Sequence, residues 1–218
     1  MKNYLCSALI LLAMVSCDNK KEAVKTSYKT PDMKLASDVM TPEVLWSFGR
    51  IGSVSVSPDQ KTLLYDVTYF NKEEDRSYSD IYVMNLADGK SKQLTDTDYK
   101  EFGETWTSDG KIAFMSSKSG SVQLWEMNAD GSGLTQLTNV EGGIGGFIFS
   151  PDKSKLLFLK DVKLEQDVHD LHPDLPKANA RLIDGQVYRH WNDWVEAYTH
   201  PFVADYIPGQ MVKRHHGR

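Results

Sequence analysis

Two segments of the chain place a serine and an aspartate two residues apart, a combination that could form a catalytic pair. Ser57 and Asp59 lie in VSVSPDQKTLLYDV, and Ser150 and Asp152 lie in FIFSPDKSKLLFL. In both, alternating apolar residues precede Ser-Pro-Asp and a second apolar run follows; a degenerate copy, ETWTSDGKIAFMSS, occupies 104–117. Because the pairs recur in register with turns, we expect each aspartate to hydrogen-bond its own turn backbone.

The histidines of HDLHPD could take part in metal binding. His169 and His172 are three residues apart and could present two imidazoles, with Asp170 or Asp174 nearby. A polar loop at the rim of the fold explains the same residues without a metal, and we favour it. We therefore predict neither a metal site nor a cofactor.

A third group of residues is the best candidate for contact with a substrate. Arg189, His190 and Asp193 could reach a cavity and hold a substrate carboxylate or carbonyl group. Trp191 and Trp194 could line that cavity. Alternatively, the two tryptophans fill a packing seam and Arg189 pairs locally, and the sequence leaves both interpretations open.

None of the serines has the surroundings of a hydrolase nucleophile. The chain contains no Gly-x-Ser-x-Gly sequence, and Ser53, Ser119 and Ser121 lack that glycine frame. GGIGG at 142–146 precedes a strand rather than a helix, so we interpret it as a turn and not as a phosphate-binding loop. We predict no catalytic residue in the chain, which would be inactive on its own.

The N-terminus resembles a bacterial lipoprotein signal. Lys2 is followed by the apolar run YLCSALILLAMVSC, after which the sequence turns polar and Lys-rich. Lipidation of Cys17 would make it the first mature residue and anchor the chain to a membrane; ordinary signal-peptidase cleavage and an uncleaved anchor are the alternatives. The other cysteine is Cys6, so the remaining chain has no thiol for a disulfide, a cysteine-based zinc site or thiol catalysis.

The elements that carry these residues follow an internal repeat. QLT recurs at 93–95 and 136–138, an offset of 43 that also separates Asp109 from Asp152. In the first copy we predict strands at 53–57, 62–70, 81–86 and 90–95, with an exposed charged loop at 71–80 and a short helix at 42–49 that Thr41 caps. Four short antiparallel strands at this interval are typical of a β-propeller blade.

The copies over 53–160 resemble the TolB-like propeller repeat, with its Ser-Pro-Asp-Gly hairpin, Asp-Gly turn and closing Gln-Leu-Thr. This repeat occurs in the translocation protein TolB, which binds proteins, and in the N-terminal propeller of prolyl oligopeptidase-family serine peptidases. YRHWNDW before HPFV resembles the peptidase branch. The resemblance implies a propeller that sits over an α/β-hydrolase domain and filters substrates by size.

The third copy is interrupted. Its next strand is expected at 200–206, after an insertion of about 162–197. We predict that the insertion is partly helical because apolar residues recur there at helical spacing, namely Leu182, Val187, Trp191, Trp194 and Tyr198. The tail KRHHGR fits neither strand nor cap. Closure takes about four to eight blades, so we expect the chain to be the N-terminal piece of a longer protein.

The sequence thus predicts an all-β fold, a partial β-propeller of two complete four-stranded blades and an interrupted third. Residues 1–17 form the signal, 18–36 a flexible tether and 37–218 the incomplete propeller. The net charge of −5 indicates no nucleic-acid partner. We expect a part of an envelope peptidase that acts on short peptides; the alternatives are a TolB-like module that binds an envelope protein and a remnant that does not fold.

Overall fold

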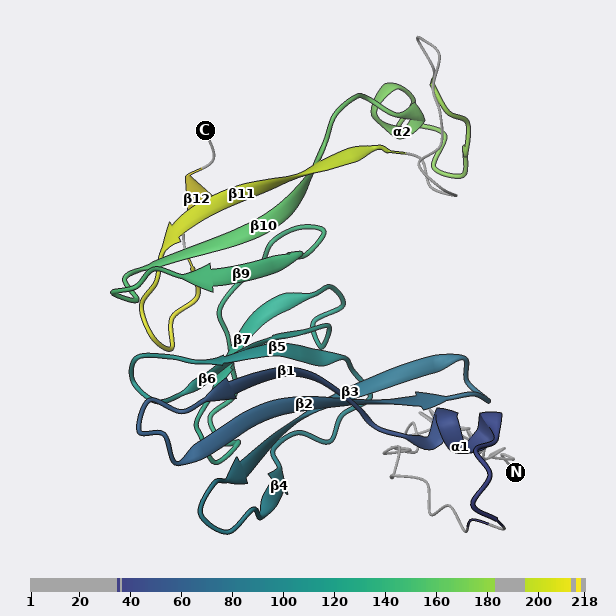
Figure 1. Cartoon of the computed structure of the whole chain (residues 1–218). Coiled ribbons are helices and arrows are strands. Elements are labelled where there is room, and N and C mark those ends of the chain that lie inside the picture. Colours follow the sequence, from purple (N-terminus) through teal and green to yellow (C-terminus); the bar gives the residue numbers. More distant parts are fainter. Residues whose placement is uncertain (1–34, 36, 183–194, 213–214, 217–218) are drawn as a thin grey trace, which may run out of the picture.

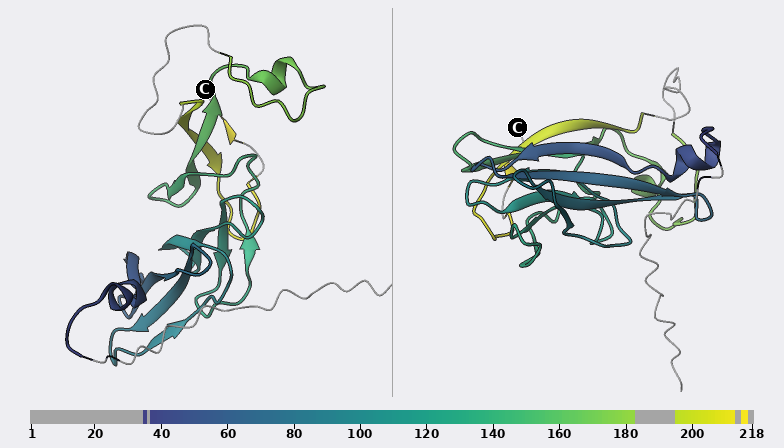
Figure 2. Two further views of the ribbon diagram at one scale, coloured as in Figure 1. Left: turned by 90° about the vertical axis from the view of Figure 1, so that its right-hand side faces the viewer. Right: turned by 60° about the horizontal axis from the view of Figure 1, so that its bottom comes forward.

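The computed structural model describes residues 35, 37–182, 195–212 and 215–216. Within these residues the chain forms three antiparallel sheets of four strands, each built from four consecutive strands. The sheets follow one another along the chain (Figures 1 and 2). The predicted all-β, partial-propeller fold is confirmed, and each sheet is one blade.

The first blade follows a short helix. Helix α1 spans Pro42–Ser47, and Thr41 caps it as predicted, its hydroxyl accepting from the Val44 N–H at 3.4 Å. The strands are β1 (Arg50–Val56), β2 (Thr62–Asn71), β3 (Arg76–Asn85) and β4 (Ser91–Gln93).

The loop predicted at 71–80 is wrong in its extent. Strands β2 and β3 pair from Thr62↔Asn85 to Asn71↔Arg76, which leaves only 72–75 as the turn. The ladder continues because Tyr69 stands opposite Tyr78 and because the next blade buries Ser79, which is 4% exposed. Only the tip of the charged segment is solvated.

The second blade is buried on both faces. Its strands are β5 (Glu101–Trp106), β6 (Ile112–Ser116), β7 (Gln123–Met127) and β8 (Thr135–Gln136). Successive side chains of a strand point to opposite faces. Ile112 and Phe114 accordingly pack with Leu64 of the first blade, whereas Ala113 and Met115 pack with residues of the third blade.

The third blade is completed by the tail. Its strands are β9 (Gly146–Phe149), β10 (Lys155–Lys163), β11 (Ala197–Asp205) and β12 (His215–His216). The strand predicted at 200–206 is present. The prediction that KRHHGR fits no strand is wrong, because β11 offers an open edge where His215 and His216 pair with Ala204 and Val203.

The insertion between β10 and β11 contains a helix, but not at the predicted residues: Leu182 lies in no helix, and Val187, Trp191 and Trp194 lie outside the described residues. Helix α2 spans Val168–Leu171, and Asp167 caps it. Tyr198 lies on β11 rather than on a helix because the β10–β11 ladder extends to Lys163↔Ala197 and places Tyr198 opposite Val162. No helix of the described residues is long and apolar enough to cross a membrane.

The recurring Ser-Pro-Asp segments form the same turn in all three blades. The hydroxyls of Ser57, Thr107 and Ser150 each donate to the aspartate two residues later, at 2.6 Å. The fourth residue of each turn has a positive φ: 60° at Gln60, 78° at Gly110 and 57° at Lys153. These aspartates therefore stabilise turns, as predicted.

Candidate functional site

The two ends of the blades differ in what they carry. One end carries the three Ser/Thr-x-Asp turns together with the connections 86–90, 128–134 and 206–214. The other end carries the connections 72–75, 117–122 and 164–196, and we call it the insertion end. Helix α1 lies at this end too, beside the tips of β2 and β3 (Figure 1). This end carries the longest connection between strands, 164–196, and long connections often carry binding sites.

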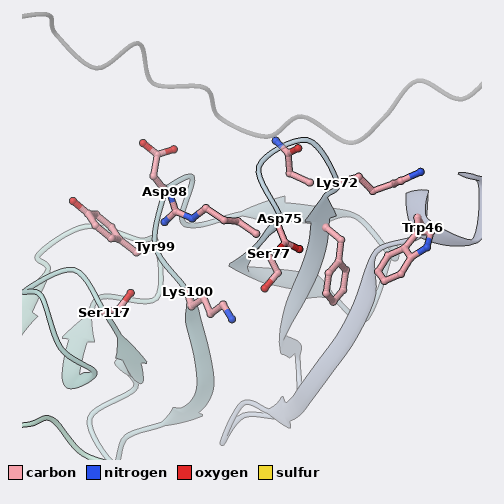
Figure 3. Close-up of a pocket in the computed structure, with 11 residues that line it drawn as sticks. Trp46, Lys72, Asp75, Ser77, Asp98, Tyr99, Lys100 and Ser117 are labelled. Carbon is pink, nitrogen blue, oxygen red and sulfur yellow. The ribbon is translucent and has the colours of Figure 1, made fainter. Parts of the chain in front are cut away.

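A pocket of about 700 Å³ opens at the insertion end of the first blade. Helix α1 and the β2–β3 turn form one side of it, and the segment that precedes β5 forms the other (Figure 3). Its volume suits a small ligand. The residues that line it are Trp46, Phe70, Asn71, Lys72, Asp75, Arg76, Ser77, Asp98, Tyr99, Lys100 and Ser117.

An aromatic pair forms one wall of the pocket, and an arginine outside the lining packs against that pair. The rings of Trp46 and Phe70 meet edge to face, with centroids 5.4 Å apart. The guanidinium of Arg50 lies 4.5 Å from the Phe70 centroid and 5.3 Å from the Trp46 centroid. Such cation–π contacts are favourable, so Arg50 helps to hold α1 against β2. Trp46 remains 41% exposed.

The charged residues of the lining comprise three cations and two carboxylates. Lys72, Asp75 and Arg76 come from the β2–β3 turn and the start of β3, whereas Asp98 and Lys100 come from the segment before β5. The lining is thus positive by one charge, although the whole chain carries −5. A local excess of positive charge attracts an anionic group.

A second cluster of chemical interest lies in the seam between the first and second blades. Ser53 is bonded to two buried carboxylates: its hydroxyl lies 3.0 Å from Asp66 Oδ1 and 2.9 Å from Glu104 Oε1, and its N–H donates to Asp66 Oδ1 at 2.7 Å. Asp66 and Glu104 are 4% and 3% exposed. Glu104 Oε2 has no hydrogen-bond partner among the described residues.

Burial governs the protonation of this seam. It raises the pKa of Glu104 to about 7, and the charge of Asp66 adds to the effect. Further out in the same seam, burial raises the pKa of Asp80 to about 6 and also raises the pKa of Glu101. These carboxyl groups can hold protons near neutral pH, but none of them lines the pocket at the insertion end, so we assign them to the structure.

A second seam lies between the second and third blades, and its buried carboxylate, Glu126, has a cation and a hydroxyl as partners. Glu126 accepts from Lys111 Nζ at 2.6 Å and from the Tyr206 hydroxyl at 2.5 Å. The pKa of Lys111 is raised by its bond to Glu126. The pKa of Tyr206 is raised mainly by burial and, after that, by its hydrogen bond to Glu126. Glu126 therefore forms an ion pair, whereas Glu104 forms none with the residues that the structure describes.

The predicted site residues fall mostly outside the described part of the chain. Cys17 and the five candidates of the insertion lie there, so their roles stay predictions; the five are Arg189, His190, Trp191, Asp193 and Trp194. The described residues hold no group of three or more His, Cys, Asp or Glu that could bind a metal ion. Asp170 instead bonds the ammonium of Lys163 and the N–H of Asp167.

Sequence reasoning missed the pocket. Most of its residues come from α1, from the 71–80 segment that we interpreted as an ordinary charged loop, and from the segment before β5; Phe70 and Ser117 complete it. The only signal was the charge of that segment beside aromatic residues, and it could not be distinguished from a solvated turn.

Comparison with known proteins supports the expected relationship. The chain matches no family model. Dipeptidyl-peptidase 5 of Porphyromonas gingivalis is 43% identical over 174 residues, which cover 79% of the chain and 25% of that protein. Dipeptidyl-peptidase 5 of Porphyromonas endodontalis is 35% identical over 198 residues, which cover 90% of the chain and 29% of that protein. The chain thus spans only a quarter to a third of the length of these relatives.

A solved structure agrees on the fold. The acylaminoacyl peptidase of Pyrococcus horikoshii aligns with a TM-score of 0.58 and 18% identity, over 79% of the chain and 25% of that protein. The predicted resemblance to the propeller part of a peptidase is confirmed.

Proposed function

We propose that the chain is the propeller part of an envelope serine peptidase and that it controls which peptides reach a hydrolase domain outside these 218 residues. The observation that carries the proposal is the 43% identity to a dipeptidyl-peptidase over most of the chain. The blades add a physical reason. A propeller of tightly packed sheets leaves room for an extended short peptide to pass, whereas a folded protein is too wide.

The chemistry of the proposed peptidase would lie elsewhere in the protein. Acyl transfer by a serine needs a nucleophile, a base and an oxyanion hole, and the sequence has no Gly-x-Ser-x-Gly elbow to supply the first. The first test is to read the gene beyond the codon for Arg218 in all three frames. An elbow there, followed by an aspartate and a histidine, supports the proposal; a stop with no elbow downstream overturns the peptidase part.

The gating role has its own test, made on the longer protein. We expect kcat/KM to fall steeply as unfolded peptide substrates lengthen, while hydrolysis of a small chromogenic ester stays constant and shows that the active site is intact. Equal cleavage of long and short peptides would contradict gating, even if the peptidase chemistry is present.

We also propose that Cys17 is lipidated and anchors the protein to a membrane of the cell envelope. The support is the apolar run that ends in MVSC and the Lys-rich tether that follows. Cells fed a labelled fatty acid should label the wild-type chain and not C17S. C6S is the matched control and should be labelled like the wild type. Labelling of C17S would refute the assignment.

A further inference from the structure

We propose that the pocket at the insertion end binds the free carboxylate of a short peptide, with Lys100 and Arg76 holding the carboxylate and Trp46 covering an apolar side chain. This inference rests on the proposed function, because it takes short peptides as the molecules that reach the propeller. It adds a named subsite within the described residues.

The cations of the pocket are available to a ligand. None of the ion pairs within the described part of the chain involves Lys72, Arg76 or Lys100. Arg76 instead lies with its guanidinium 5.6 Å from the ring centroid of Tyr78, which leaves its N–H groups free to donate. Charged donors are the strongest partners for a carboxylate.

The backbone fixes where these cations stand. Lys100 bridges to Ser79 of the first blade, and its carbonyl accepts from the N–H of Ser117 of the second blade at 3.4 Å. Arg76 is the first residue of β3 and pairs with Asn71. The side chain of Asn71 accepts from two N–H groups of the turn, at 3.0 and 3.2 Å. The backbones of both cations are therefore restrained, and both side chains line the same pocket.

The other groups of the pocket match the rest of a short peptide. Trp46 and Phe70 offer an apolar wall that Arg50 supports from behind. Asp98 lies across from them in Figure 3, beside Tyr99. A dipeptide has one carboxylate, one ammonium and small apolar groups, so it complements cations, a carboxylate and aromatic rings together. A bare anion such as phosphate would use the cations alone.

The test measures binding of the dipeptide Ala-Phe and of its carboxamide to the full chain by titration calorimetry. We expect the acid to bind roughly tenfold more tightly than the amide, the effect of losing about one charge-assisted hydrogen bond. In K100Q and R76Q that preference should shrink toward unity, whereas K100R should keep it. K61Q is the matched control, because Lys61 is exposed in a turn at the opposite end.

Three results would overturn the proposal. The first is equal binding of the acid and the amide by the wild type. The second is a loss of affinity in K100Q that is the same for both ligands, which indicates a structural role. The third is inorganic phosphate that displaces Ala-Phe and binds as tightly, which indicates an unspecific anion site.

Two further measurements test the role of the aromatic wall and whether the recognised carboxylate is that of the peptide terminus. W46A should weaken Ala-Phe more than Ala-Ala. A dipeptide amide with an aspartate side chain should bind no better than Ala-Phe amide if the pocket recognises the peptide terminus; tighter binding would overturn that assignment. Failure of this site while the longer protein still cleaves short peptides leaves the proposed function intact. Binding of Ala-Phe with no hydrolase elbow in the gene overturns the peptidase proposal alone.

Discussion

The substitution E104Q tests whether the first seam of the propeller holds a proton. Glu104 is 3% exposed, and its neighbour across the seam, Asp66, is a second buried carboxylate. The hydroxyl of Ser53 has one hydrogen and lies within bonding distance of both carboxylates. It can therefore satisfy only one of them at a time, and a proton on Glu104 relieves the conflict.

The magnitude follows from the pKa. Burial raises the pKa of Glu104 from its ordinary 4.5 to about 7, and at 1.36 kcal/mol per pKa unit this costs about 3 kcal/mol once the group is ionised. The folded protein binds the proton more tightly than the unfolded chain. The free energy of unfolding should therefore be unaffected below about pH 4.5 and fall as the pH rises to about 7.

Glutamine keeps the size of the side chain and an oxygen that can accept from Ser53, but it cannot ionise. At about pH 8, E104Q should thus unfold with a free energy up to about 3 kcal/mol higher than that of the wild type, and the two should converge toward about pH 5. Urea titrations followed by tryptophan fluorescence measure this difference. E141Q, which changes an exposed glutamate, is the control and should follow the wild type throughout.

Asp80 and Glu101 titrate in the same direction, because burial raises the pKa of each. The wild type therefore keeps some pH dependence after Glu104 is replaced, and the informative quantity is the difference between the two proteins. If the stability curves of wild type and E104Q run parallel from about pH 5 to pH 8, the seam holds no such proton and the reasoning is refuted.

Other substitutions test the packing of the blades. Y206F removes the hydroxyl that donates to Glu126 and should lower the free energy of unfolding by about 1–3 kcal/mol in urea titrations. G52A places a Cβ 2.3 Å from a carboxylate oxygen of Asp66 and should destabilise by a similar amount, about 1–3 kcal/mol, visible as a lower Tm. Q60G relieves a φ of 60° and should raise the free energy of unfolding by up to about 1 kcal/mol; an unchanged or lower Tm contradicts this.

The repeat made most of the fold predictable. The offset of 43 residues and the Asp-Gly turns located the strands of two blades, because a tight turn requires a positive φ at a fixed place. Gly110 shows this requirement directly, and Gln60 and Lys153 adopt the same conformation without being glycine. Only the alignment of the three copies indicated that Gln60 and Lys153 occupy the same turn position as Gly110.

The errors arose where a distant element decides the structure. The polar residues of 77–80 look like loop in isolation, but the second blade covers Ser79, so the ladder continues there. The histidines of the tail form a strand because β11 has a free edge. Neither influence is visible in a local pattern.

The sites were hard to predict for the same reason. Ser53 and Glu104 stand 51 residues apart in the sequence, and a β-bulge in each of their strands helps to place them in one seam. The pocket joins α1 to the start of β5. Only the stacking of blade on blade brings such residues together, and the sequence shows blades without showing which side chains share a seam.

The two seams should consequently respond differently to pH. In the second seam Lys111 and Tyr206 bond to Glu126, so its buried charge has partners. In the first seam no cation is among the groups that act most strongly on Glu104, and its lone hydroxyl partner is shared. A buried charge with partners tolerates ionisation, whereas one without them favours protonation or exposure. Rising pH should therefore loosen the joint between the first and second blades before the joint between the second and third.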